Sequence, residues 1–220
     1  MKEVKNILLL VGSPHRNKST SNSLGQYIID NINEESFNIE KLYLQNSIKL
    51  EERKDLLINK VNDADIIILA YPLYMDTLPA VVIKALELIE DNIIKKKRKF
   101  ISICNCGYPK EKGMEVSQDI CENFAENTGM EWLGSLSLAK GPLIMGKPID
   151  KLGFMTGNIK IALDLTIKAL EENEKIPKSA DQNMKMMIPN WLYVFMVNNI
   201  MRFRAIKDGG YGKYKNNLKN

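Results

Sequence analysis

The amino-acid sequence predicts an α/β protein with a doubly wound, five-stranded parallel sheet and a helical C-terminal extension. First, short segments of near-continuous apolar residues, typical of strands buried on both faces, alternate with segments of helical periodicity. Second, this alternation ends after Pro148, and only helical patterns follow. We therefore expect residues 1–150 to form one sheet domain and residues 151–220 to form the extension, which packs on that domain or on a partner subunit.

Five segments are expected to form the strands. Residues 7–11 (I-L-L-L-V) and 66–70 (I-I-I-L-A) are apolar at every position, which is typical of central parallel strands. Residues 39–44, 100–104 and 132–138 complete the set. Because a helical segment separates each strand from the next, the connections are expected to be crossovers and the sheet to be parallel.

Helical segments connect these strands. Residues 24–32 show the spacing of one apolar helix face, and residues 56–61 belong to a second helix. Pro79 suits the first residue of a third helix, since the first turn needs no intrahelical N–H from it. Residues 113–127 are expected to form a fourth helix, and residues 159–170 an amphipathic helix of the extension.

The end of the chain is rich in methionine and aromatic residues. Two interpretations of residues 184–206 stay open: a helix that packs on the body or on a second subunit, or a pliable cover for a flat apolar ligand, since methionine adapts its shape readily. The longest apolar run, residues 191–197, is far shorter than the ~20 residues of a membrane-spanning helix. We expect no transmembrane segment and a homodimer, with contact to a membrane surface as the alternative role of this segment.

Charge is distributed unevenly along the chain. Residues 1–150 hold 19 Lys and Arg against 21 Asp and Glu, whereas residues 151–220 hold 12 against 6, so the formal net charge of +4 arises in the extension. A basic segment could bind nucleic acid, anionic lipid or an acidic cofactor, or could be a solvated face. Because solvated faces are the commonest case, we interpret it as one and expect no nucleic-acid partner.

Cysteine and histidine usage excludes several classes of protein. Three cysteines are too few for a disulfide-stapled secreted fold, and no signal-peptide pattern precedes the first strand, so we expect a cytoplasmic protein. His15 is the single histidine, which excludes metal sites built on two or three imidazoles, and the chain has no G-x-S-x-G motif of serine hydrolases. We expect no metal site and no catalytic side chain.

Three loops follow the predicted strands. Because ligands of open parallel sheets bind beyond the carboxyl ends of the strands, residues 12–22, 71–78 and 105–112 are the candidate binding loops. The first is rich in hydroxyl side chains and leads into a helix, an arrangement that binds phosphate through hydroxyls and backbone N–H groups. The other two supply aromatic, Met, Pro and Gly residues, which suit a planar ring. Together the three loops fit FMN.

Other nucleotide sites do not fit the sequence. Residues 141–148 (G-P-L-I-M-G-K-P) come close to a P-loop, but Pro148 occupies the position that needs a Mg²⁺-binding hydroxyl. No G-x-G-x-x-G follows the first strand, and the second predicted strand ends without the carboxylate that binds a dinucleotide ribose. A mononucleotide remains as the ligand.

Two motifs resemble the NAD(P)H-dependent FMN reductase-like branch of the flavodoxin-like superfamily. Residues 12–20 (G-S-P-H-R-N-K-S-T) are similar to its phosphate loop, G-S-P-R-x-x-x-N/S-T/S. Residues 71–80 (Y-P-L-Y-M-D-T-L-P-A), followed by Lys84, are similar to its second loop, P-x-Y-x-x-x-x-P-a-x-x-x-K. The resemblance covers about residues 5–135 and implies a flavodoxin-like fold that binds FMN.

The resemblance also implies which residues line the site. At the phosphate it places Ser13, His15, Arg16, Asn17, Ser19, Thr20 and Ser21. Beside the isoalloxazine ring it places Pro72, Leu73, Tyr74, Met75, Asn105, Gly107 and Tyr108. The family often has Arg where His15 stands, which leaves Arg16 as a candidate phosphate ligand. Some relatives carry an iron–sulfur cluster, but Cys104, Cys106 and Cys121 fall short of the four thiolates that a cluster takes.

The function implied by the resemblance is that of an FMN-dependent oxidoreductase. It would pass reducing equivalents from NAD(P)H to an electron acceptor such as a quinone, a nitro or azo compound, a flavin or a protein. The alternative is a flavodoxin-type electron carrier that does not itself oxidise NAD(P)H. Such carriers are smaller and strongly acidic, whereas this chain is net basic and has a long extension, so we favour the enzyme.

Overall fold

The structure is a computed structural model that describes residues 4–110 and 113–207. Its centre is a five-stranded sheet in the order β2-β1-β3-β4-β5, and every neighbouring pair is parallel. The strands are β1 (Lys5–Val11), β2 (Phe37–Tyr43), β3 (Ile66–Pro72), β4 (Lys99–Asn105) and β5 (Glu131–Leu138). This is the strand order of flavodoxin-like proteins, so the predicted fold class is confirmed.

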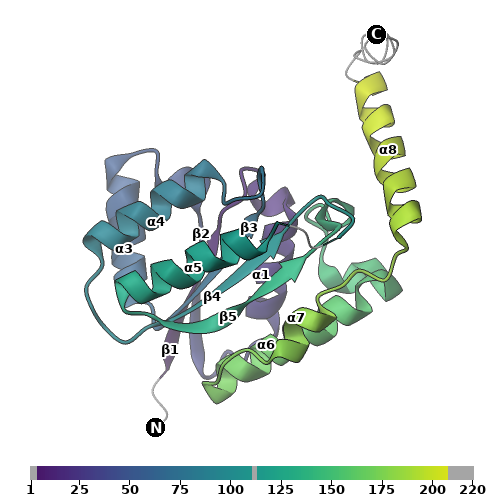
Figure 1. Ribbon diagram of the computed structural model, residues 1–220. Coiled ribbons are helices and arrows are strands. Elements are labelled where there is room, and N and C mark those ends of the chain that lie inside the picture. The colour runs from purple at the N-terminus through teal and green to yellow at the C-terminus, as the bar shows by residue number, and fades with distance from the viewer. Residues whose placement is uncertain (1–3, 111–112, 208–220) are drawn as a thin grey trace. The chain divides into compact units, whose positions relative to one another are not determined.

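Helices cover both faces of the sheet (Figure 1). The helices of the described residues are α1 (Thr20–Asn31), α2 (Leu44–Ser47), α3 (Glu51–Asp63), α4 (Ala80–Asn92), α5 (Glu115–Thr128), α6 (Gly157–Glu172), α7 (Lys178–Asn183) and α8 (Asn190–Lys207), with short 3-10 turns at Arg16–Lys18, Gly141–Leu143 and Ile149–Thr156. In Figure 1, α3, α4 and α5 lie on one face of the sheet and α1 lies on the other. Because both faces are covered, the strands can be apolar at nearly every position.

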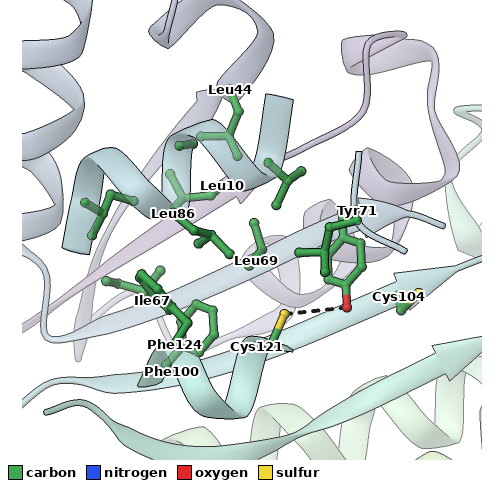
Figure 2. Close-up of a cluster of buried hydrophobic side chains, with 14 of the residues drawn as sticks. Leu10, Leu44, Ile67, Leu69, Tyr71, Leu86, Phe100, Cys104, Cys121 and Phe124 are labelled. Atoms are coloured by element: carbon green, nitrogen blue, oxygen red, sulfur yellow. Dashed lines mark hydrogen bonds between the residues drawn. The ribbon is translucent and has the colours of Figure 1, made fainter. Parts of the chain in front are cut away.

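The core beneath α3, α4 and α5 is formed by alternate residues of the central strands (Figure 2). Leu10, Ile67 and Leu69 of the strands pack with Leu86 of α4 in this cluster. The ring of Phe100 in β4 lies 5.3 Å from that of Phe124 in α5, in an edge-on arrangement. Burial of each such side chain contributes roughly 1.5–3 kcal/mol, so the sheet is a rigid base for the loops at its edge.

Several element boundaries differ from the sequence prediction, and three of them lie at turns. Leu44, expected to end the second strand, begins α2. Pro79 caps α4 instead of opening it: its ψ of 144° is extended, and Ala80 is the first helical residue. Gly113, expected to open the fourth helix, has a φ of +80°, and α5 begins at Glu115. Local turn geometry decides each of these boundaries, and apolar periodicity does not report it.

Strand register brings the candidate loops to one edge of the sheet. Val11 of β1 pairs with Tyr43 of β2 and with Ala70 of β3. Ala70 in turn pairs with Ile103 of β4, which pairs with Leu136 of β5. The carboxyl ends of all five strands are therefore aligned, and the segments that follow them meet at this edge.

The chain divides into two compact units, Met1–Met187 and Ile188–Asn220. The expected division at residue 150 thus falls inside the first unit. Two contacts explain why α6 and α7 belong to it: the Tyr27 hydroxyl of α1 donates to Asp164 of α6 at 2.8 Å, and the Ser137 N–H of β5 donates to Asp181 of α7 at 2.8 Å. Met184, expected in the C-terminal helix, is likewise buried and precedes the second unit.

The second unit contains the helix α8. Within α8, Tyr193 is the one buried residue, whereas Trp191, Phe195 and Phe203 are exposed. Apolar side chains are distributed around the whole helix, and Arg202, Arg204 and Lys207 follow near its end. Within the part of the chain that the structure describes, no helix has both the length and the apolarity of a membrane span.

Candidate functional site

The first loop leaves β1 through a glycine in a tightly packed position. The Gly12 N–H donates to the carbonyl oxygen of Ala70 at 2.8 Å, which extends the pairing of β1 with β3 by one residue. A Cβ atom at Gly12 would lie 2.4 Å from Cγ2 of Val82 in α4. Glycine therefore allows β1 and α4 to approach closely, and it fixes the point at which the loop begins.

The loop next forms one 3-10 turn before α1. The Ser13 hydroxyl accepts a hydrogen bond from the His15 N–H at 3.3 Å, and the Ser13 carbonyl accepts from the Arg16 N–H at 3.1 Å. Arg16 has a φ of +50°, in the left-handed region that non-glycine residues seldom adopt. The side chains of His15, Arg16 and Asn17 are exposed, whereas Ser13 is buried.

The start of α1 has the geometry of a capped helix N-terminus with backbone donors. Ser19 is the N-cap residue, and its hydroxyl accepts from the Asn22 N–H at 3.1 Å. Among the described residues, no hydrogen bond engages the backbone N–H of Thr20 or of Ser21, although both residues are buried. Two buried N–H donors at the positive end of a helix are suited to a phosphate group.

The hydroxyls of this segment bind protein atoms. Ser19 donates to the Arg16 carbonyl at 2.6 Å, and Thr20 donates to the Gly141 carbonyl at 2.7 Å. Ser21 accepts from the Asn105 amide at 2.8 Å. The sequence assigned these hydroxyls to the phosphate; in the structure the Ser19 and Thr20 hydroxyls donate within the protein, which leaves the N–H groups of Thr20 and Ser21 and the Ser21 O–H as donors for an anion.

The second loop is a tight turn after β3. The backbone groups of Tyr74 and Thr77 bond to each other at 2.9 and 3.1 Å, and Met75 and Asp76 between them have φ values of +50° and +61°. Positive φ at both central positions corresponds to a type I′ turn, which usually contains Gly or Asn. Met75, at the tip, is 94% exposed, and Tyr74 is also exposed.

Leu73 points its side chain into the protein. The side chain is buried in the core cluster, so only the backbone of Leu73 faces the loop surface. Its backbone N–H donates to the Asn105 carbonyl at 2.7 Å and joins the second loop to the third. Pro72, the last residue of β3, is half-buried.

Buried side chains support this second loop from below. Tyr71, which precedes Pro72, is fully buried, and its hydroxyl donates to the Ser117 carbonyl of α5 at 3.2 Å and accepts from the Cys121 thiol at 3.5 Å (Figure 2). Burial raises the pKa of Tyr71 well above its usual value. The phenol therefore stays neutral and acts as a fixed anchor between β3 and α5.

The third loop follows β4 and contributes Asn105, Gly107 and Tyr108. Asn105 is buried, whereas Gly107 and Tyr108 are exposed. The Asp76 carboxylate of the second loop raises the pKa of Tyr108, both by its negative charge and by accepting a hydrogen bond from the phenol. The two ring-facing loops therefore meet at Asp76 and Tyr108.

A fourth segment, which the sequence did not assign to the site, follows β5. The Gly141 N–H donates to the Cys106 carbonyl at 2.9 Å, and a Cβ at Gly141 would lie 2.9 Å from the Asn105 Oδ1. A Cβ at Gly146 would lie 2.6 Å from the Cα of Lys18 in the first loop. The two glycines that gave residues 141–148 a P-loop-like pattern thus allow this segment to pack closely on the other loops.

The cysteines of the described chain are buried and form no disulfide with one another. Burial raises the pKa of the Cys104 thiol to about 12 and that of the Cys121 thiol to about 11. Neither is therefore a thiolate near neutral pH. Among the described residues, no group of three or more His, Cys, Asp and Glu side chains is arranged to hold a metal ion.

These features fit FMN. Paired N–H donors at α1, exposed aromatic side chains at Tyr74 and Tyr108 and a close-packed backbone at Gly141 lie along one edge of the sheet. A comparison with protein families matches residues 5–142 to the NADPH-dependent FMN reductases. The chain belongs to this family.

Solved structures share the fold of this FMN reductase family member. An NADH:FMN oxidoreductase in its apo form superposes with a TM-score of 0.60 at 12% identity, over 81% of this chain and 94% of that one. A flavone reductase gives 0.56 at 14% identity, over 80% and 70% of the two chains. An FMN-dependent NADH-azoreductase from Bacillus anthracis str. Ames Ancestor, in complex with FMN, gives 0.54 at 13% identity, over 76% and 99%. A comparison with curated protein sequences finds no match.

Family membership confirms the expected class of activity and cofactor. As an FMN reductase family member, the protein is an oxidoreductase that uses FMN, with NAD(P)H as co-substrate. The matched residues 5–142 include the first three segments described above and the beginning of the fourth.

Proposed function

We propose that the protein oxidises NAD(P)H through bound FMN and passes the reducing equivalents to a small-molecule acceptor, namely a quinone, a nitro or azo compound, or a free flavin. The observation that carries this proposal is the pair of buried N–H groups of Thr20 and Ser21 at the same sheet edge as the exposed Tyr74, Met75 and Tyr108. This pairing provides one subsite for a phosphate and one for a ring.

The protein's own groups would bind and orient the cofactor. The N–H groups of Thr20 and Ser21 would hold its phosphate, while Tyr74 and Tyr108 would flank its ring. FMN, when bound, accepts a hydride from the nicotinamide and gives up electrons to the acceptor. No side chain has to act as a general base, so the residues at this edge need only position the reactants and limit access of water.

The exposed side chains of the second and third loops favour a reductase with a broad choice of acceptors. Met75 and Tyr108 are 94% and 46% exposed, so an apolar surface remains open where a second substrate would approach. Flat apolar acceptors such as quinones and nitroaromatic compounds can stack on such side chains.

Two measurements on the purified full chain test this function. Heat-released flavin should chromatograph as FMN, because the carboxyl edge of the sheet offers a phosphate subsite at the start of α1, which fits a mononucleotide. Under anaerobic conditions, NADH or NADPH should then bleach the visible flavin absorbance, and a quinone should restore it. A colourless protein that takes up no FMN would contradict the proposal, whereas FMN that NAD(P)H leaves oxidised would indicate an electron carrier.

We further propose that the enzyme is a cytoplasmic homodimer in which α8 covers an apolar surface of a second copy. Exposed Trp191, Phe195, Met201 and Phe203 support this proposal, because soluble monomers seldom expose so many large apolar side chains together. The positive charges of Arg202, Arg204 and Lys207 would suit an anionic membrane surface instead, and binding to anionic vesicles by a monomeric protein would favour that role.

A further inference from the structure

Asn105 joins segments of the site that lie far apart in sequence. Its side-chain amide donates to the Ser21 hydroxyl in the first turn of α1 at 2.8 Å and to the Tyr71 carbonyl at the end of β3 at 2.9 Å. Its backbone carbonyl accepts a hydrogen bond from the Leu73 N–H at 2.7 Å. Asn105 is 5% exposed, so these bonds are shielded from water.

The resemblance placed Asn105 beside the flavin ring, but its amide group is already occupied. A side-chain amide has two N–H donors, and here one binds Ser21 and the other binds Tyr71. The amide oxygen faces Gly141, where a Cβ would lie 2.9 Å from it. No N–H donor of the side chain is left over for a cofactor.

We propose that Asn105 is a positioning residue: it holds the phosphate-binding turn of α1 in line with the ring-binding loops and does not bind FMN itself. Ser21 provides the hydroxyl that Asn105 holds and also one of the two N–H groups available to a phosphate. The Asn105 amide therefore fixes the direction in which this N–H points. This inference rests on the proposed binding of FMN.

The two sides of the site depend on the Asn105 side chain to different extents. On the ring side, the backbone bond from Leu73 to the Asn105 carbonyl does not involve the side chain and would survive its removal. On the phosphate side, the side-chain bond to Ser21 is the link between β4 and the first turn of α1 that would be lost. Truncation of Asn105 should therefore weaken phosphate binding more than ring binding.

The test compares FMN with riboflavin, which lacks the phosphate, on the full chain. In Asn105→Ala the Kd for FMN should rise roughly tenfold, as expected when a buried hydrogen bond that orients a charged contact is lost. The Kd for riboflavin should rise less than about threefold. The ratio of the riboflavin Kd to the FMN Kd should therefore fall. Both are measured by quenching of flavin fluorescence, and thermal unfolding shows that the variant is folded.

Two further variants make the test specific. Ser21→Ala should lower the ratio in the same way, and adding Asn105→Ala to it should change the ratio little, because both substitutions break one link. Asn6→Ala is the matched control: the Asn6 amide also donates to a backbone carbonyl, that of Asp63 at 3.1 Å, but at the amino edge of the sheet. It should leave the ratio unchanged.

The outcomes separate this inference from the proposed function. Equal weakening of FMN and riboflavin in Asn105→Ala would mean that Asn105 binds the ring and would overturn the positioning role. Additive effects of the Ser21 and Asn105 substitutions would overturn the link through Ser21. If the unaltered protein binds neither flavin, the proposed function itself fails.

Discussion

The Thr20 hydroxyl donates to the Gly141 carbonyl at 2.7 Å, although 121 residues separate them in the sequence. This bond fixes the first turn of α1 to the segment that follows β5, and both residues are buried. The next residue, Ser21, accepts a hydrogen bond from Asn105 at the end of β4. Two consecutive hydroxyls therefore attach α1 to segments at the ends of two different strands.

Thr20→Val should therefore destabilise the protein while it keeps the shape of the side chain. We expect the free energy of unfolding to fall by about 0.5–1.5 kcal/mol, because the bond from the Thr20 hydroxyl is lost, although the Gly141 carbonyl keeps the N–H of Ile144 at 2.9 Å. Urea unfolding measures this change. Thr166→Val is the control: the Thr166 hydroxyl binds the Ala162 carbonyl inside α6, so the substitution breaks a bond within one helix and none between distant segments, and the loss should be about 0.5 kcal/mol or less.

Stability should decrease at alkaline pH because of two buried thiols. Burial raises the pKa of Cys104 from 9.0 to about 12 and that of Cys121 from 9.0 to about 11. Above pH 9 these thiols ionise in the unfolded chain but stay neutral in the folded one. The stabilisation is thus fully present below pH 9 and is lost as the pH rises toward 11.

Each thiol can lower the free energy of unfolding by about 1 kcal/mol per pH unit in this range. Urea unfolding of the reduced protein at several alkaline pH values measures the slope. Cys104→Ala/Cys121→Ala should show a shallower decrease than the unaltered chain. Parallel slopes in the two proteins would show that these thiols do not cause the alkaline loss.

Met75 sits at the tip of the second loop with left-handed backbone geometry. This geometry costs a non-glycine residue about 1–2 kcal/mol, whereas glycine adopts it freely at an entropic cost of about 0.5–1 kcal/mol in the unfolded chain. Because the side chain is 94% exposed, little packing is lost on its removal. Met75→Gly should therefore leave the free energy of unfolding unchanged or raise it by up to about 1 kcal/mol.

Val116→Gly provides the comparison for Met75→Gly. Val116 is also exposed, but it lies in the first turn of α5 with ordinary helical geometry, so glycine should lower the stability by up to about 1 kcal/mol. Urea unfolding compares the two variants. A loss at Met75 as large as that at Val116 would show that the turn is not strained in solution.

Truncation should separate folding from assembly. A chain that ends at Met187 keeps the whole first unit, so it should fold and bind flavin but remain a monomer if α8 forms the dimer contact. A chain that ends at Lys178 loses the buried Ala180 and Met184 and the Asp181 carboxylate that binds Ser137, so it should be much less stable. Light scattering and thermal unfolding distinguish the two. A dimeric chain ending at Met187 would exclude α8 from the interface.

The distribution of apolar residues along the chain was sufficient to predict the sheet. The continuous runs at residues 7–11 and 66–70 became the central strands β1 and β3, since a strand covered on both faces has no polar alternation. Periodicity did not locate the boundary of the first unit, because Asp181 and Met184 belong to it through contacts with residues that precede them by many positions.

The loops of the site were predictable, whereas the roles of their side chains were not. Hydroxyl-rich residues after β1 indicated a phosphate loop, and α1 indeed begins there. What each hydroxyl binds depends on Asn105 and Gly141, which the fold brings to α1 from distant parts of the chain. The spacing of Gly141 and Gly146 was the available signal for the fourth segment, but it resembles a P-loop, which Pro148 excludes, and no second reason for these glycines is visible in the sequence.

The burial of all three cysteines makes this protein a convenient background for site-specific labels. Because the Cys104 and Cys121 thiols are neutral and shielded at physiological pH, maleimide and methanethiosulfonate reagents would find little to modify in the folded body. A cysteine introduced at an exposed position of α8, such as Asn198→Cys, would then carry nearly all of the label. If the proposed dimer forms, a spin probe at that position would report the distance between its two copies of α8, without any native residue having to be replaced first.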